Sequence, residues 1–159
     1  MATLDDAPAA AEGVPLGRRL GMTFHHVGVA VESIDCALEY YEGVFGFERV
    51  GRAVEVFPEN VRVCFLRVPG GAMIELVEGL TEESPVKGVL KRAGAGAYHI
   101  CYAVNDLDEA IRGLRRARCL PFRRFQVDHA AWRRFAFLLT PDRQLFELCE
   151  VTPRQNDVP

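Results

Sequence analysis

Long hydrophobic runs, a disulfide framework and an excess of positive charge are all missing from this sequence, and each absence excludes a class of protein. No apolar run approaches the roughly 20 residues that a transmembrane helix needs. The five cysteines are odd in number and include no Cys-x-x-Cys pair, which favours free thiols in a reducing cytoplasm. The net charge of −3 offers no general footprint for nucleic acid. We therefore expect a cytoplasmic protein that binds neither membranes nor nucleic acid.

The N-terminal segment also lacks targeting features. Residues 1–22 contain no basic region followed by an apolar stretch, so we expect a flexible tail there and no signal peptide. With 159 residues in all, 49% of them hydrophobic and 26% charged, the chain has the composition of a globular protein with one compact domain. We expect that domain to cover residues 23–152, and residues 153–159 to form a C-terminal tail.

What the sequence does contain is an internal repeat. A stretch that begins HVGVAV at His26 is similar to one that begins HICYAV at His99, and each continues into an amphipathic helix and a turn. Two later runs, MIELVE and LFELCE, also match, and their third residues are Glu75 and Glu147. The two histidines are 73 residues apart and the two glutamates 72. Agreement of residue type, order and spacing indicates a duplication.

Each copy predicts a βαβββ module, so the expected fold class is α+β. The first module covers residues 23–80 and the second residues 97–152. Residues 81–96 form a linker with a short helix that has Pro85 at its first position. We expect the two tandem modules to form a curved mixed sheet around a metal-binding cleft. The other strands are expected at residues 47–56, 61–68, 119–127 and 132–139.

The alternation of side chains along a strand separates the two neighbouring histidines. His26 shares a face with two small residues, Gly28 and Ala30, which leave room for another group to approach. His25 is expected on the opposite, valine-rich face, which a helix would cover, and there it would pack or cap. His99 repeats the position of His26 in the second copy, so His26 is the candidate for function and His25 is not.

Four polar residues lie in the middle of apolar strands. A glutamate with apolar neighbours is costly unless it is paired or coordinated. We predict that four candidate ligands, two from each module, converge on one divalent metal ion such as Co²⁺, Mn²⁺, Ni²⁺, Zn²⁺ or Fe²⁺. The alternative is that the glutamates are exposed on edge strands and the histidines are structural. The four candidate ligands are His26, Glu75, His99 and Glu147.

The repeated pattern His-hydrophobic-x-x-Ala-Val and the paired xxELxE runs resemble the vicinal oxygen chelate superfamily, which includes glyoxalase I and the extradiol dioxygenases. Within it, stretches such as EESPVKGVLKRAGAGAYHICYAV resemble the methylmalonyl-CoA epimerases. The resemblance covers residues 23–152. It implies a divalent metal held by the four candidate ligands, and a homodimer, since dimers are common among such proteins.

The same resemblance implies an isomerase that forms a metal-stabilised enolate of an acyl thioester. In an epimerase, a base removes the proton next to the thioester carbonyl, and an acid returns a proton on the opposite face. Glu147 and Glu75 are the symmetric candidates for the base. Glu59 and His129, which lie in expected hairpin turns, are the second choices.

Two other functions remain open. The stretch RRFQVDHAAWRRF departs from the glycine-rich stretch usual in the epimerases, which favours a lyase or a tailoring enzyme of specialised metabolism that acts on another chelating substrate. A non-catalytic binding or resistance module is the third hypothesis. An iron(II) dioxygenase is disfavoured, because a fourth protein ligand would crowd the positions that substrate and O₂ require.

A local cluster of arginines stands out in the second copy. It can be interpreted as the solvated face of a helix and a turn, or as a dock for an anionic group such as a nucleotide phosphate on a carrier. Its members are Arg112, Arg115, Arg116, Arg118, Arg123 and Arg124.

Overall fold

The computed structural model describes residues 13–126 and 134–151 of the chain. The expected hairpin turn that holds His129 and the expected tail at 153–159 lie outside the described residues. The elements, in chain order, are α1 (Leu16–Arg19), β1 (Thr23–Ala30), α2 (Ile34–Tyr41), β2 (Glu48–Val56), the 3-10 turn η2 (Phe57–Glu59), β3 (Val61–Arg67), β4 (Met73–Gly79), α3 (Pro85–Ala93), β5 (Gly96–Val104), α4 (Leu107–Arg116), β6 (Leu120–Gln126), β7 (Arg134–Leu139) and β8 (Leu145–Glu150).

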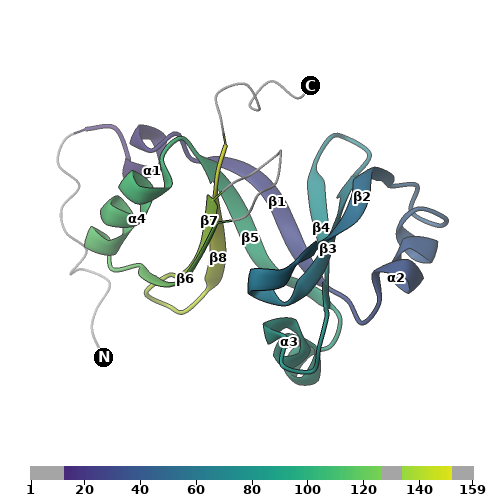
Figure 1. Cartoon of the computed structure of the whole chain (residues 1–159). Coiled ribbons are helices and arrows are strands. Elements are labelled where there is room, and N and C mark those ends of the chain that lie inside the picture. Colours follow the sequence, from purple (N-terminus) through teal and green to yellow (C-terminus); the bar gives the residue numbers. More distant parts are fainter. Residues whose placement is uncertain (1–12, 127–133, 152–159) are drawn as a thin grey trace.

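The strands form one mixed sheet in the order β2-β3-β4-β1-β5-β8-β7-β6. β1 runs parallel to β4, and β5 runs parallel to β8 in the same way. The two halves meet where β1 pairs antiparallel with β5 in the middle of the sheet (Figure 1). Each half repeats the order of the other outward from this seam. The sequence expectation of an α+β fold with paired βαβββ modules is confirmed.

The inner face of the sheet is curved. Val61 and Val63 from β3 belong to the same buried cluster as Phe135 and Phe137 from β7, although these strands lie near opposite edges of the sheet. Only a sheet that bends toward itself brings such distant strands into one core. α3 contributes Val86 and Leu90 to this cluster. It lies below the strands in Figure 1.

The outer face of each half is covered by one helix, α2 in the first half and α4 in the second (Figure 1). The apolar side of α2 packs on a buried cluster that includes Val29 and Leu76, and α4 packs on a second that includes Leu138. Both helices begin at a side-chain cap. Ser33 accepts a hydrogen bond from the backbone N–H of Cys36 at 3.4 Å, and Asp106 does so from Glu109 at 2.8 Å.

A second glutamate in each xxELxE run also holds the start of a helix. The Glu78 carboxylate accepts a hydrogen bond from the backbone N–H of Ile34, and Glu150 accepts one from Leu107, both at 2.9 Å. Because Glu78 lies three residues after Glu75, the two carboxylates leave the strand on opposite faces. The run therefore places one glutamate in the cleft and the other under the helix N-terminus.

The expectation of a flexible tail over residues 1–22 is wrong for its last part. Residues Leu16–Arg19 form helix α1, and Leu20 is buried against the cluster beneath α4. α1 lies close to α4, where the Leu16 side chain approaches Gly113 (Figure 1). Leu16, Leu20 and Met22 anchor this segment because they bury apolar area that a free tail would leave in water.

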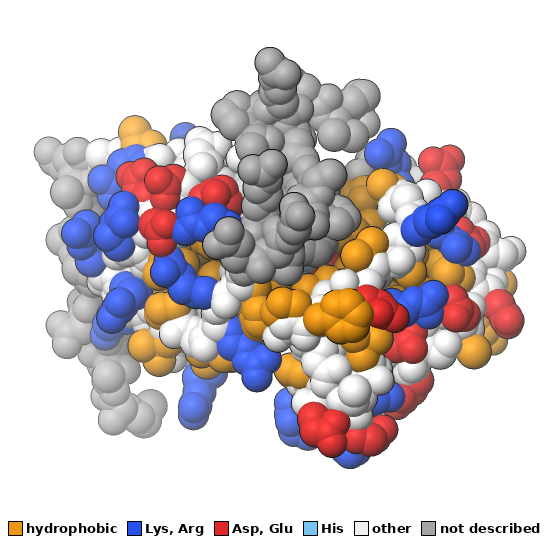
Figure 2. Space-filling model, in the orientation of Figure 1, with side chains coloured by type: hydrophobic (Ala, Val, Ile, Leu, Met, Phe, Trp, Pro, Cys, Tyr) orange, Lys and Arg blue, Asp and Glu red, His pale blue; other side chains and the backbone are white. Residues whose placement is uncertain are grey.

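Charged side chains cover much of the outer surface, and Lys and Arg gather over α4 and β6 (Figure 2). None of the helices within the described residues is long and apolar enough to cross a membrane.

Candidate metal centre

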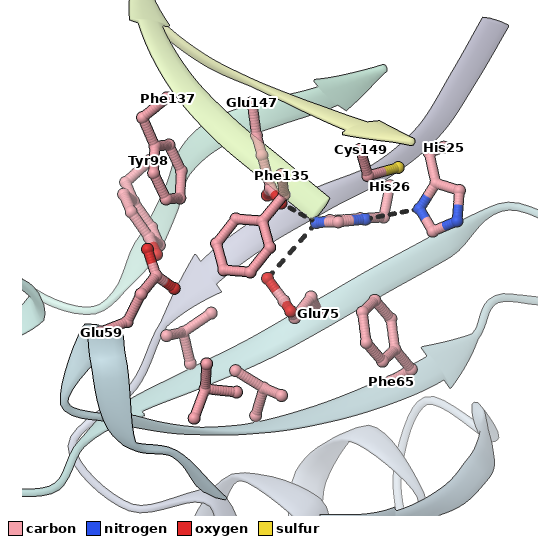
Figure 3. A pocket seen from close by; sticks show the side chains of 13 residues that line it. His25, His26, Glu59, Phe65, Glu75, Tyr98, Phe135, Phe137, Glu147 and Cys149 are labelled. Carbon is pink, nitrogen blue, oxygen red and sulfur yellow. Dashed lines mark hydrogen bonds and ion pairs between the residues drawn. The ribbon is translucent and has the colours of Figure 1, made fainter. Parts of the chain in front are cut away.

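The four candidate ligands converge between the two halves of the sheet. Each comes from a different strand, and their donor atoms all lie within 4.8 Å of one another. The Nε2 atoms of His26 and His99 are 3.3 Å apart. His26 Nε2 lies 3.3 Å from Glu75 and 3.5 Å from Glu147 (Figure 3). His99 Nε2 lies 3.0 Å from Glu147. The structure thus brings the four residues together, and their role as metal ligands stays a prediction.

All four side chains are buried, so their charges strongly affect one another. Burial by itself lowers the pKa of His26, but the nearby carboxylates of Glu75 and Glu147 outweigh burial and raise that pKa to about 10. Burial raises the pKa of Glu147, but hydrogen bonds from His26 and His99 outweigh it and lower the pKa to about 2. A positive charge among these residues is therefore strongly favoured, and a proton on His26 supplies it in the protein alone.

The donor set fits a divalent cation. Two buried carboxylates lie beside two imidazoles, and within residues 13–126 and 134–151 neither carboxylate pairs with a lysine or arginine. Buried carboxylates without a counter-charge are costly, and a divalent ion supplies that charge. Mixed nitrogen and oxygen donors suit Zn²⁺, Fe²⁺, Ni²⁺, Co²⁺ or Mn²⁺.

Gly28 makes room for the second imidazole. It lies opposite His99 across the β1–β5 seam, and a Cβ atom at this position would come within 1.9 Å of the His99 ring. No side chain larger than hydrogen leaves His99 where it is. The interpretation that small residues beside His26 allow another group to approach is confirmed, and that group is His99.

The expectation that His25 points away from the site is wrong. Between Phe24 and His26 the β1–β5 register shifts by one residue, so His25 is the extra residue of a β-bulge. The bulge turns the His25 ring toward the cleft, where its Nδ1 lies 2.7 Å from Nδ1 of His26. Strict alternation fails at such a position, and one sequence offers no sign of a bulge in an apolar strand.

The two ring nitrogens of His26 therefore have different partners. Nε2 faces the carboxylates and Nδ1 faces His25. Burial, followed by the charge of His26, lowers the pKa of His25, which leaves a neutral ring able to accept a hydrogen bond. A proton on His26 Nδ1 directed at His25 leaves the Nε2 lone pair for a cation. Within the described residues, the corresponding Nδ1 of His99 has no hydrogen-bond partner.

A second bulge at the seam brings Tyr98 into the same pocket. The register shifts again between Gly28 and Val29, which leaves Tyr98 as the extra residue on β5. Tyr98 precedes His99 as His25 precedes His26, so the two copies carry the bulge at matching positions. Burial and then the charge of Glu75 raise the pKa of Tyr98 well above its ordinary value, so its hydroxyl keeps its proton.

Glu59 enters the pocket from the 3-10 turn between β2 and β3. Its carboxyl lies beside Tyr98 and across the pocket from Glu147 (Figure 3). Burial, with the charges of Glu147 and Glu75, raises the pKa of Glu59 to about 9. In the protein without a metal ion, the Glu59 carboxyl therefore favours its protonated form at neutral pH. The sequence ranks it only among the second choices for the base, because its environment depends on residues far away in the chain.

The chain belongs to the glyoxalase/bleomycin resistance protein/dioxygenase superfamily, whose family profile matches residues 25–137. This is the superfamily that the repeated motifs resemble.

Several relatives within this group are epimerases. The chain is 33% identical to the mitochondrial methylmalonyl-CoA epimerase of Bos taurus over 118 residues, which are 74% of this chain and 63% of the bovine protein. It is 34% identical over 134 residues to YqjC, an uncharacterized protein of Bacillus subtilis, covering 83% of this chain and 94% of that protein. The structure of a Mycobacterium tuberculosis methylmalonyl-CoA epimerase superposes with a TM-score of 0.71 at 29% identity, over 84% of this chain and 90% of that one. The resemblance to the epimerases is confirmed.

Proposed function

We propose that this protein is a divalent-metal-dependent epimerase of an acyl thioester, similar to the methylmalonyl-CoA epimerases. The observation that carries the proposal is a pocket lined by His26, Glu75 and Glu147, with His99 beside them, into which Glu59 also points with a raised pKa. A divalent cation bound there would polarise the thioester carbonyl and stabilise the negative charge that develops on its oxygen.

The chain also supplies two groups that can exchange protons from different sides of the pocket. An epimerase needs one group that accepts the α-proton and another that delivers a proton to the opposite face. The Glu147 carboxylate has a lowered pKa, and the Glu59 carboxyl has a raised one. Residues whose environments drive their pKa values apart suit the base and the acid respectively.

In the proposed reaction the substrate loses one proton and gains one. Glu147 removes the α-proton as the carbon–hydrogen bond breaks, and Glu59 gives its proton to the opposite face of the same carbon. The reverse reaction exchanges the two roles. Tyr98 lies beside Glu59 in the same pocket. Glu75, the other candidate base of the sequence analysis, is assigned here as a ligand only, whereas Glu147 is assigned as both ligand and base, because it lies across the pocket from Glu59.

The relatives support the choice of substrate. One solved structure is a Streptomyces coelicolor methylmalonyl-CoA epimerase variant in complex with 2-nitronate-propionyl-CoA, which is 25% identical to this chain with a TM-score of 0.69, over 80% of this chain and 96% of that one. For this chain we propose methylmalonyl-CoA or a close acyl thioester. The homodimer stays a prediction.

The test is deuterium uptake from D₂O into the α-position of each epimer of methylmalonyl-CoA, with the metal-loaded protein. We expect exchange together with interconversion of the epimers. Glu59→Gln should exchange one epimer only and should not interconvert them, because one of the two proton-transfer groups is gone. The matched control is Glu55→Gln on the exposed side of β2. Absence of exchange in the metal-loaded protein contradicts the proposal and favours a lyase or tailoring enzyme with another substrate.

A further inference from the structure

A hollow of the described surface lies over α4 and β6, away from the four candidate ligands. It encloses about 480 Å³, which is within the usual range for small-molecule sites. Arg112 and Arg115 line it from α4, and Arg123 and Arg124 line it from β6. Figure 2 shows Lys and Arg side chains gathered on this part of the surface. We call this hollow, with its four arginines, the arginine groove.

Most of the positive charge in the arginine groove is available to a ligand. Its one carboxylate, Asp108, pairs with Arg124 at 2.5 Å and also with Arg134. Within residues 13–126 and 134–151, neither Arg112 nor Arg115 nor Arg123 forms an ion pair. Three guanidinium groups that line one hollow repel one another, which favours an anionic ligand. This local positive charge contrasts with the net charge of −3 of the whole chain.

The arginine groove adjoins the pocket that His26, Glu75 and Glu147 line. Phe122 lines the groove and Phe137 lines the pocket, and their ring centroids are 6.3 Å apart. Arg123 pairs with Phe137 in the β6–β7 register, which puts both side chains on the same face of the sheet. The charge of Arg123 also acts on Glu59, whose pKa it lowers against the stronger effect of burial. The groove and the pocket therefore form neighbouring parts of one surface.

The edge position of β6 explains this continuity. β6 is the last strand of the sheet, so side chains from its two faces meet around a free edge. Arg124 lies on the α4 side, where Asp108 holds it, and Arg123 lies on the cleft side. Among the described strands none lies beyond β6, so the cleft side and the α4 side of this strand meet at one edge.

The groove also offers an exposed aromatic ring. Phe122 is 53% exposed although it is a large apolar residue, and it lines the groove while its ring contacts Phe137 of the pocket. Arginines bind phosphate oxygens in pairs of hydrogen bonds, and a free aromatic ring can stack on a nucleobase. The combination is characteristic of a nucleotide with several phosphates, rather than of an inorganic anion alone.

We infer that the arginine groove binds the phosphorylated nucleotide end of a coenzyme A thioester while the acyl end lies among the four candidate ligands. This inference rests on the proposed function, since the acyl group and the nucleotide must belong to one molecule. It also gives a role to the arginines that the sequence could assign either to a solvated face or to an anion dock. Arg116, on the same helix, does not line the groove.

The first experiment measures binding of adenosine 3′,5′-bisphosphate to the metal-loaded full chain by calorimetry, without any turnover. We expect binding that weakens about 10-fold or more in Arg112→Ala/Arg115→Ala, since each lost charged hydrogen bond is worth about a factor of 10. Arg116→Ala is the matched control on α4 and should bind as the wild type does. Absence of binding to the wild type, or equal weakening in the control, overturns the inference.

The second experiment compares two substrates in the deuterium-uptake assay, methylmalonyl-CoA and the N-acetylcysteamine thioester of the same acyl group, which lacks the nucleotide. The wild type should have a much lower KM for the CoA thioester, and Arg112→Ala/Arg115→Ala should lose most of this preference. An equal KM for the two substrates overturns the inference. So does exchange that requires the acyl group on a carrier protein, since a protein surface would then occupy the groove.

The two experiments separate the inference from the proposed function. If no thioester exchanges its α-proton but the bisphosphate binds and the double variant abolishes this binding, the proposed epimerase fails and the nucleotide site is supported. If the truncated thioester is exchanged but the bisphosphate does not bind, the epimerase stands and the arginine groove is rejected.

Discussion

His25 acts on the pocket through its neighbour. Its Nδ1 lies 2.7 Å from His26 Nδ1, and this contact orients the ring whose other nitrogen faces the carboxylates. Partners of this kind typically account for about 10- to 100-fold in metal affinity. If His25 only packed against the strand, a polar residue of different shape would not preserve the metal affinity.

We expect His25→Ala to lower the affinity for Zn²⁺ or Co²⁺ by about 10-fold, while His25→Asn retains most of it, because the asparagine oxygen can accept the same hydrogen bond. Competition titration with a chelator measures the affinity, and the absorption spectrum of the Co²⁺ form reports the geometry of the ligands. Equal dissociation constants for His25→Ala and the wild type would show that the hydrogen bond does not orient His26.

The raised pKa of Glu59 has a consequence for stability. Its pKa is about 9 in the folded protein against an ordinary value of 4.5. Between these values the unfolded chain releases the proton while the folded chain keeps it, so the wild type loses stability as the pH rises through this window. A glutamine in this position has no proton to lose.

The stability of Glu59→Gln relative to the wild type should therefore be higher at about pH 8 than at about pH 5. That is, the difference in the free energy of unfolding, variant minus wild type, should become more positive as the pH rises. Urea denaturation of the chelator-treated proteins measures it. Glu55→Gln, on the exposed side of β2, should show no such dependence. A difference between Glu59→Gln and the wild type that is the same at both pH values would mean that Glu59 is ionised in the folded protein.

At the scale of the elements, both copies of the repeat contain the same glutamate cap at the start of a helix. Glu78 binds the first N–H of α2, and Glu150 binds that of α4. Arg62 adds an ion pair to Glu78 at 3.5 Å, and Arg134 adds one to Glu150 at 3.2 Å. The negative charge also interacts favourably with the positive end of each helix dipole.

Glu78→Ala and Glu150→Ala should each lower the free energy of unfolding by about 1–2 kcal/mol, the usual effect of losing a helix cap. Urea denaturation measures the change, and Glu82→Ala in an exposed turn is the control. Metal content at saturating metal should stay at the level of the wild type, since both carboxylates face away from the cleft. Loss of metal in either variant would show that the helix and the ligands are coupled.

The strands show where local patterns suffice and where they fail. Alternation places Glu75 with Val77, and Glu147 with Cys149, on the cleft face, and the structure has all four along the pocket. The same rule fails at His25, since a bulge inserts one residue into the pairing and reverses the face. A bulge depends on the partner strand, which a local pattern does not contain.

At the scale of the whole molecule, the four candidate ligands connect the two halves of the sheet. His26 and Glu75 come from the first half, and His99 and Glu147 from the second. A cation that binds all four stabilises only the folded arrangement, because the unfolded chain does not bring these residues together.

Metal removal should therefore lower the Tm. At a free metal concentration 100 times the dissociation constant, binding adds about 2.7 kcal/mol, or roughly 5–10 °C for a domain of this size. Calorimetry with and without a chelator measures the change. His26→Ala/His99→Ala should show no metal-dependent change in Tm. Equal Tm values for the wild type with and without chelator would argue against a resident divalent ion.

The sequence by itself determined the duplication, the α+β class and the identity of the four candidate ligands. These follow from residue type, spacing and alternation, which are local or repeat along the chain. Only the tertiary structure decided that His25 and Tyr98 enter the pocket, that Glu59 is a neutral acid and that Arg123 lies beside it. Each of these depends on strand pairing or on charges that come from distant parts of the chain, and the fold alone brings those parts within a few ångströms.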